Sequence, residues 1–197
     1  MDKKIGMYSG AANTFAVMAF AASMIFGFDF GGYLASMFIS LSFLPLACAF
    51  AERSRARAAG KTAVAFAAVY VTFILIIYFA QLTTLRNETL TNQAAALLDY
   101  QAFGLFFNLN LLGYGVMSLS TFFLGLTITP KTKADKVLKC LLMIHGIFFI
   151  SGLVMPISGV FTTMEGADFI GTIVLLVWCA YFAPIGILSF KHFKENL

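Results

Sequence analysis

Residues 30–51 read FGGYLASMFISLSFLPLACAFA, and residues 52–61 continue as ERSRARAAGK. The first stretch runs for 22 residues without a charge. A helix that rises about 1.5 Å per residue needs about 20 apolar residues to cross the roughly 30 Å hydrocarbon core of a bilayer. The second stretch supplies Arg53, Arg55, Arg57 and Lys61, and such basic clusters stay on the cytoplasmic side. This passage alone predicts a transmembrane helix that ends in the cytoplasm.

Five further stretches of the chain are also long and apolar. The six expected helices span about residues 7–28, 31–51, 62–85, 102–127, 138–161 and 169–190. Transmembrane β-strands would instead alternate in polarity over segments of about ten residues. The predicted fold is therefore an all-α integral membrane protein, a six-transmembrane-helix bundle that forms one domain over residues 1–197.

The composition supports a membrane environment. Of the 197 residues, 60% are apolar and only 11% are charged, whereas soluble domains carry roughly 25% charged residues. Lys3 and Lys4 precede the first apolar run as in a secretory signal, but no clear small-residue cleavage site follows. The first run is therefore expected to stay as a helix.

The basic residues predict the orientation. With the N-terminus inside, twelve of the thirteen Lys and Arg residues fall on the cytoplasmic side, and Arg86 alone lies outside. The prediction is a multi-pass protein of a cell membrane, with both termini cytoplasmic. The compact loops indicate a bacterial cytoplasmic membrane.

Several classes of partner are not expected. The net charge of +4 comes from short basic clusters between apolar runs, without the continuous basic surface of a nucleic-acid-binding protein. No cofactor fingerprint occurs. The three cysteines stand alone, and a metal site needs three or four converging ligands, so no cofactor or metal is predicted. Membrane lipids are the expected surroundings.

Two patterns mark the predicted outer side. Asp29-Phe30 and Asp168-Phe169 begin the second and sixth helices, each sixteen residues before a proline. This spacing suggests three helical hairpins related by rotation, with the aspartates as helix caps or, alternatively, as an anionic rim. The long outer loop contains NQAAALL at residues 92–98, which predicts a short helix that acts as a lid or as a passive connector.

Polar residues at similar outer depth on the third and fourth helices indicate a ligand pocket. The candidate ligand-binding residues are Tyr78, Gln81, Asn108, Asn110 and Tyr114. Buried polar groups are costly in a membrane and often face a water-filled cavity, but such groups also hydrogen-bond between helices to hold a bundle together. Both interpretations stay open.

The fourth uncharged stretch, residues 100–130, is longer than one span requires. It must tilt, extend beyond the hydrocarbon core, or break at Gly113-Tyr114-Gly115. Broken helices often build substrate sites in transporters. Close packing of the glycines against another helix is the alternative.

His145 is the histidine expected inside the membrane. It is the candidate acid or base if the protein is an enzyme acting on a lipid or an isoprenoid. Otherwise no catalytic residue is predicted, because no charged partner accompanies His145 in the sequence. A hydrogen-bonded packing role is the other interpretation.

Ala12 and Ala16 belong to a stripe of small residues on the first helix, which lets another helix approach closely. The size, six spans, orientation and this Ala-x-x-x-Ala pattern resemble the substrate-binding S components of energy-coupling-factor vitamin transporters. The resemblance implies capture of a small molecule from outside and docking on a membrane-protein partner through Ala12 and Ala16.

The leading hypothesis is a non-enzymatic membrane protein that binds, or helps to transport, a small neutral or amphipathic molecule through an outward-facing pocket. An accessory subunit of a larger membrane complex or a homo-oligomer, and a membrane-embedded enzyme, are the alternatives.

Overall fold

The computed structural model describes residues 2–163 and 167–195. These residues form helices and turns, with no strand among them. The long helices are α1 (Asp2–Ile25), α2 (Asp29–Glu52), α3 (Arg57–Leu82), α6 (Leu105–Thr127), α7 (Lys133–His145), α8 (Phe148–Ser158) and α10 (Ala167–Glu195). The short ones are α4 (Thr84–Asn87), α5 (Asn92–Leu98), the 3-10 turn η1 (Tyr100–Ala102) and α9 (Val160–Thr163).

The predicted number of apolar helices is confirmed within the described part of the chain. Six helical segments are long and apolar enough to cross a membrane, counting α7 and α8 as one segment. Their outer surfaces expose large apolar side chains: Phe26 is 82% exposed, and Phe15 and Ile157 are each 77% exposed. Such a surface suits contact with lipid and not with water.

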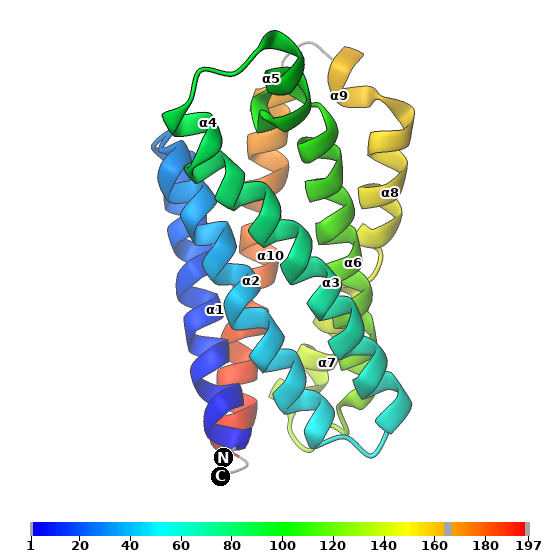
Figure 1. The fold of residues 1–197 in the computed structure, drawn as a ribbon. Coiled ribbons are helices and arrows are strands. Elements are labelled where there is room, and N and C mark those ends of the chain that lie inside the picture. Colours follow the sequence, from blue (N-terminus) through cyan, green and yellow to red (C-terminus); the bar gives the residue numbers. More distant parts are fainter. Residues whose placement is uncertain (1, 164–166, 196–197) are drawn as a thin grey trace.

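The helices form a bundle in which neighbours along the chain are neighbours in space (Figure 1). α1 packs between α2 and α10, α3 packs between α2 and α6, and α6 also packs against α7 and α8. Both ends of the described chain lie at the same end of the bundle, called here the terminal end. The opposite end, called the α5 end, carries α4, α5 and α9.

The first two predicted hairpins are packed pairs, α1 with α2 and α3 with α6, whereas α10 packs chiefly against α1 and only weakly against α7. The relation of the hairpins by rotation stays a prediction. Asp29 begins α2, and its carboxylate accepts a hydrogen bond from Gln101 Nε2 at 3.0 Å. Asp99 caps η1 by accepting from the backbone N–H of Gln101. The side chain of Asp168 lies outside the described residues.

The interruption occurs in the fifth span and not in the fourth. α7 ends at His145, and the turn before α8 is tightened by hydrogen bonds from Gly146 N to Met143 O (3.2 Å) and from Ile147 N to Ile144 O (3.0 Å). These bonds span three residues in place of four, which is the 3-10 pattern. The single uninterrupted helix predicted over residues 138–161 is therefore divided.

The fourth span is a continuous helix, so the break considered at Gly113-Tyr114-Gly115 is not formed. An added Cβ on Gly152 of α8 would lie 2.7 Å from Leu111 O and 3.0 Å from the Cα of Gly115, whereas one on Gly115 would make only ordinary contacts at 3.6 Å. The close packing of α6 against α8, which was the alternative, therefore depends on Gly152. The length of the uncharged stretch is accommodated instead by η1, which lies outside α6 at its start.

The predicted short helix over residues 92–98 is confirmed as α5. Thr91 caps it by accepting a hydrogen bond from the backbone N–H of Ala94. α5 stands at the α5 end beside the start of α6 (Figure 1). It is thus placed above the interior of the bundle, where the candidate site lies.

Candidate functional site

A cavity of about 390 Å³ opens inside the bundle toward the α5 end. Three tyrosines from separate elements line it: Tyr33 of α2, Tyr78 of α3 and Tyr100 of η1. Their ring centroids lie 5.5 Å (Tyr33–Tyr78), 5.9 Å (Tyr78–Tyr100) and 6.1 Å (Tyr33–Tyr100) apart. This tyrosine cluster gives the cavity an aromatic wall with polar edges.

Tyr100 is held by two neighbouring segments. Its backbone N–H donates to Gln81 Oε1 at 3.2 Å, and its hydroxyl accepts from Asn110 Nδ2 at 3.2 Å. Burial, and then the nearby Tyr78 and Tyr33, raise the pKa of the Tyr100 phenol well above its ordinary value. The phenol is therefore neutral at physiological pH and presents a hydrogen-bonding group without charge.

A second cavity of about 150 Å³ lies between α6, α8 and α10. It shares lining residues with the larger cavity, among them Tyr100, Phe107 and Leu175. Its wall is mostly apolar, with Asn110 and Tyr114 from α6 as polar contributors. The two cavities therefore form adjoining parts of one site.

Asn110 and Tyr114 line this wall, and each also has a polar atom that is buried away from the cavity. Asn110 is 1% exposed, and its Oδ1 and the Tyr114 hydroxyl are almost completely covered. The Tyr114 hydroxyl lies among the buried hydroxyl groups of Ser36, Tyr70 and Tyr78. These polar atoms therefore lie beside the cavity and not on its open surface.

The structure brings together only part of the predicted ligand set. Tyr78, Asn110 and Tyr114 line the cavities, whereas Gln81 and Asn108 do not. Asn108 is half-buried on α6. Gln81 is buried but uses its amide within the protein: Nε2 donates to Leu98 O at 2.7 Å while Oε1 accepts from Tyr100 N.

Gln81 therefore ties the segment containing α5 and η1 to the end of α3. We expect Gln81→Met to leave Leu98 O and Tyr100 N unpaired and to destabilise this segment locally by about 1–3 kcal/mol. Hydrogen–deuterium exchange should become faster over residues 92–102. Gln93→Met makes the same chemical change on the exposed surface of α5 and should leave the exchange unaltered; equal rates in both variants would contradict the role of Gln81.

His145 is buried among aromatic side chains, and both of its ring nitrogens are used. Trp178 Nε1 donates to His145 Nε2 at 3.0 Å, and Nδ1 lies 2.8 Å from Thr121 Oγ1. Because tryptophan can only donate, Nε2 must accept and the proton of the neutral ring lies on Nδ1. Thr121 Oγ1 accepts a hydrogen bond from Nδ1–H and donates its own hydrogen bond to Ser118 O at 2.8 Å. No lone pair of His145 is left to act as a base.

The two alanines of the first helix have different surroundings. Ala16 is buried in the chain's own core, whereas Ala12 is exposed. Close approach on α1 is made by Gly10, where an added Cβ would lie 2.9 Å from the backbone nitrogen of Phe190. Gly6 and Gly10 of α1 thus pack against α10 of the same chain.

Sequence reasoning missed Tyr33, Tyr100 and Trp178. Tyr33 and Tyr100 lie near the ends of apolar runs, where aromatic residues are usually read as interfacial anchors. Trp178 lies near the middle of its apolar run, too deep for an anchor, and this depth was the available signal. Its partner His145 comes from another helix, so the hydrogen bond is not visible in the sequence.

The described residues contain no group of three or more His, Cys, Asp or Glu side chains placed to hold a metal ion. Cys48, Cys140 and Cys179 are free thiols. The chemistry of the candidate site is therefore built from phenol, amide and indole groups.

No known protein family, curated protein or solved structure matches the chain. The resemblance to S components of energy-coupling-factor transporters accordingly rests on the outline of the chain and on Ala12 and Ala16.

Proposed function

We propose that the chain is a multi-pass membrane protein that binds a small neutral or amphipathic molecule in the two adjoining cavities. The observation that carries the proposal is the pair of adjoining cavities, whose walls hold the tyrosine cluster together with Asn110 and Tyr114. Amide and phenol groups both donate and accept hydrogen bonds. A ligand with a hydroxyl or an amide group would match them.

The character of the walls favours a ligand without charge. The tyrosine cluster and Trp178 offer flat aromatic faces, and the remaining lining of the smaller cavity is largely aliphatic or aromatic. Among the lining residues of both cavities, Asp29 alone is acidic, and it lies exposed at the start of α2. Burial of an unpaired charge next to the inner wall would be strongly unfavourable.

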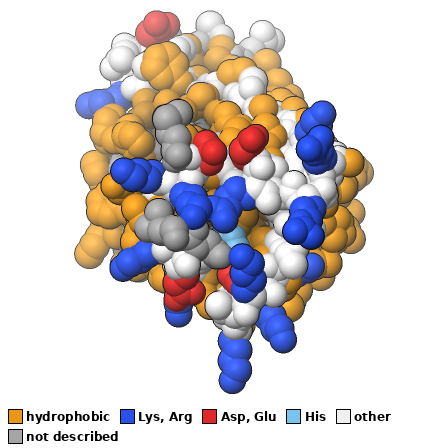
Figure 2. All heavy atoms as spheres, turned by 90° about the horizontal axis from the view of Figure 1, so that it is seen from below, with side chains coloured by type: hydrophobic (Ala, Val, Ile, Leu, Met, Phe, Trp, Pro, Cys, Tyr) orange, Lys and Arg blue, Asp and Glu red, His pale blue; other side chains and the backbone are white. Residues whose placement is uncertain are grey.

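The proposal includes a membrane orientation. Basic side chains gather on the terminal end of the bundle, as Figure 2 shows from below. Arg86 is the basic residue of α4, at the opposite end. Positive residues stay on the cytoplasmic side, so the α5 end and the cavity mouth face outward.

Trp178 provides a direct test, because it is the single tryptophan of the chain and lines the smaller cavity. A panel of neutral amphipathic alcohols and amides would be titrated into the purified protein while Trp178 fluorescence is recorded. We expect saturable changes for a subset of the panel. Asn110→Leu and Tyr114→Phe each remove one polar partner, and each should weaken binding by roughly tenfold, which corresponds to about 1.4 kcal/mol.

The control is Tyr8→Phe, which deletes the same hydroxyl from an exposed side chain of α1. If every compound fails to change the fluorescence, the proposed function is wrong. If the three variants bind alike, Asn110 and Tyr114 do not contact the ligand. Uptake of a bound compound into proteoliposomes would separate transport from binding alone.

A further inference from the structure

A third cavity, of about 300 Å³, lies at the terminal end, away from the proposed ligand site. Its lining comes from three separate places: Arg53 and Arg55 from the turn between α2 and α3, Ile128 and Lys131 from the turn between α6 and α7, and His192 from the end of α10. The cavity volume falls at the lower end of the roughly 300–1,000 Å³ typical of small-molecule sites. Arg53, Arg55 and Lys131 thus line one cavity on the end of the bundle where basic side chains gather (Figure 2).

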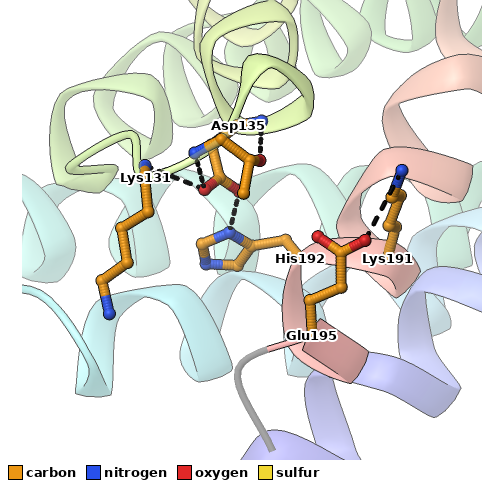
Figure 3. A network of polar contacts seen from close by, with 6 residues as sticks. Lys131, Asp135, Lys191, His192 and Glu195 are labelled. Carbon is orange, nitrogen blue, oxygen red and sulfur yellow. Dashed lines mark hydrogen bonds and ion pairs between the residues drawn. The ribbon is translucent and has the colours of Figure 1, made fainter.

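The buried carboxylate of Asp135, near this cavity, already has three hydrogen-bond partners. Asp135 is 2% exposed, and its Oδ1 pairs with His192 Nδ1 at 2.6 Å. Its Oδ2 accepts from the backbone N–H groups of Lys131 (3.0 Å) and Thr132 (3.1 Å). Figure 3 shows Asp135 between the α6–α7 turn and His192 of α10. Asp135 therefore links the α6–α7 turn to α10, and it forms no ion pair with Arg53 or Arg55.

The two arginines have no acidic partner in the described part of the chain. Glu195 pairs with Lys191 at 3.5 Å, and neither Arg53 nor Arg55 forms an ion pair with the described carboxylates. Both guanidinium groups are exposed enough to reach a ligand. An arginine fork matches the oxygens of a phosphate and binds it through paired hydrogen bonds.

Several contacts hold the residues around this cavity in place. Phe50 stacks on the His192 ring with centroids 5.5 Å apart. Lys139 Nζ of α7 donates to Ile128 O at 3.2 Å and so ties the α6–α7 turn to α7. A capping box of Thr132 and Asp135 fixes the start of α7. The cavity is therefore formed before a ligand arrives, which lowers the cost of binding.

We propose that this cavity binds a phosphate group through Arg53 and Arg55. In the proposed orientation the terminal end faces the cytoplasm, where basic pockets between transmembrane helices bind anionic lipid head groups. A soluble phosphorylated compound offers the same chemistry. The site is independent of the cavities at the α5 end, and its test does not involve Trp178 or a neutral ligand.

The test compares two double variants that each remove two positive charges from the same end. Arg53→Gln/Arg55→Gln alters the cavity lining, whereas Lys133→Gln/Lys136→Gln alters exposed residues of α7 outside it. One arm measures phosphatidylglycerol retained by the full chain, by native mass spectrometry from nanodiscs of phosphatidylcholine with a phosphatidylglycerol fraction. The other arm measures the affinity for inorganic phosphate by calorimetry. All four side chains are exposed, so thermal unfolding should be unchanged.

We expect the arginine variant to lose roughly tenfold or more in affinity, because each basic residue near an anionic surface contributes several-fold. The lysine variant should stay within about twofold of the parent chain, because Lys133 and Lys136 do not line the cavity and salt screens the charges of exposed side chains. Loss in the lipid arm identifies a lipid head group, and loss in the phosphate arm identifies a soluble ligand. The proposed phosphate site is wrong if both double variants lose the same affinity, or if the arginine variant loses none in either arm.

Discussion

Replacing His145 by alanine should lower the free energy of unfolding by about 3–5 kcal/mol, the range for removing a large buried ring. The loss has two sources. The aromatic neighbours Trp178, Tyr181 and Phe182 would surround an empty space. The Trp178 N–H would also lose its acceptor inside a region that water does not reach, which is costly by itself.

The measurement is unfolding by SDS titration in mixed micelles, followed by circular dichroism. Ile144→Ala is the control, because Ile144 is the preceding residue of α7 and is 52% exposed. The control should lower stability by less than about 1 kcal/mol, as surface substitutions usually do. If His145→Ala were equally mild, His145 would have no structural role, and its candidacy as a catalytic base would return.

The hydrogen bonds of His145 lie at the point where the fifth apolar helix is divided. Since α7 ends at His145, the ring is held by α6 through Thr121 and by α10 through Trp178 at the point where the helix is interrupted. Protonation of the ring would place two N–H donors face to face at Trp178. The network therefore requires a neutral histidine, and it locks three helices together at the discontinuity.

Gly10→Ala should destabilise the protein by about 1–3 kcal/mol, the usual cost of overpacking. An added Cβ would lie 2.9 Å from the backbone nitrogen of Phe190 and 3.0 Å from the carbonyl oxygen of Gly186. Backbone atoms cannot rotate away as side chains do, so α1 and α10 would have to separate. This loss opposes the gain of about 1 kcal/mol that alanine brings to a helix.

Gly171→Ala is the matched control for Gly10→Ala. Gly171 is also helical, but an added Cβ there meets nothing within 4 Å. The control should therefore keep or slightly raise stability in the same SDS titration, whereas Gly10→Ala lowers it. A stabilised Gly10→Ala variant would show that α1 and α10 are not closely packed at this crossing.

The long-range hydrogen bonds mark the limit of sequence reasoning for the site. Asn110 and Tyr114 were predicted from their polarity on an apolar helix, and they do reach a cavity wall. Gln81 has the same polarity, yet its amide is consumed by the backbone of residues 98 and 100. Nothing in the local sequence distinguishes a polar side chain that faces a cavity from one that bonds to a distant segment of the chain.

The glycines of the chain show the same limit. Gly113 and Gly115 were candidates for a helix break, and Gly146 was not, yet α6 is continuous and the chain turns at Gly146 and Ile147. A helical glycine has the same local energetics in both places. Packing against Gly152 supports the helix at Gly115, while the bonds of His145 stabilise the turn.

The sequence by itself determined the all-helical class, the six apolar helices, the short helix over residues 92–98 and the asymmetric placement of basic residues. These features follow from local composition, because hydrocarbon thickness and backbone hydrogen bonding leave few choices for a long apolar run. Tertiary structure alone decided which helices adjoin, where the fifth span divides, and which polar side chains face a cavity. Those outcomes depend on contacts between residues far apart in the chain, and their energies are settled only when the helices pack.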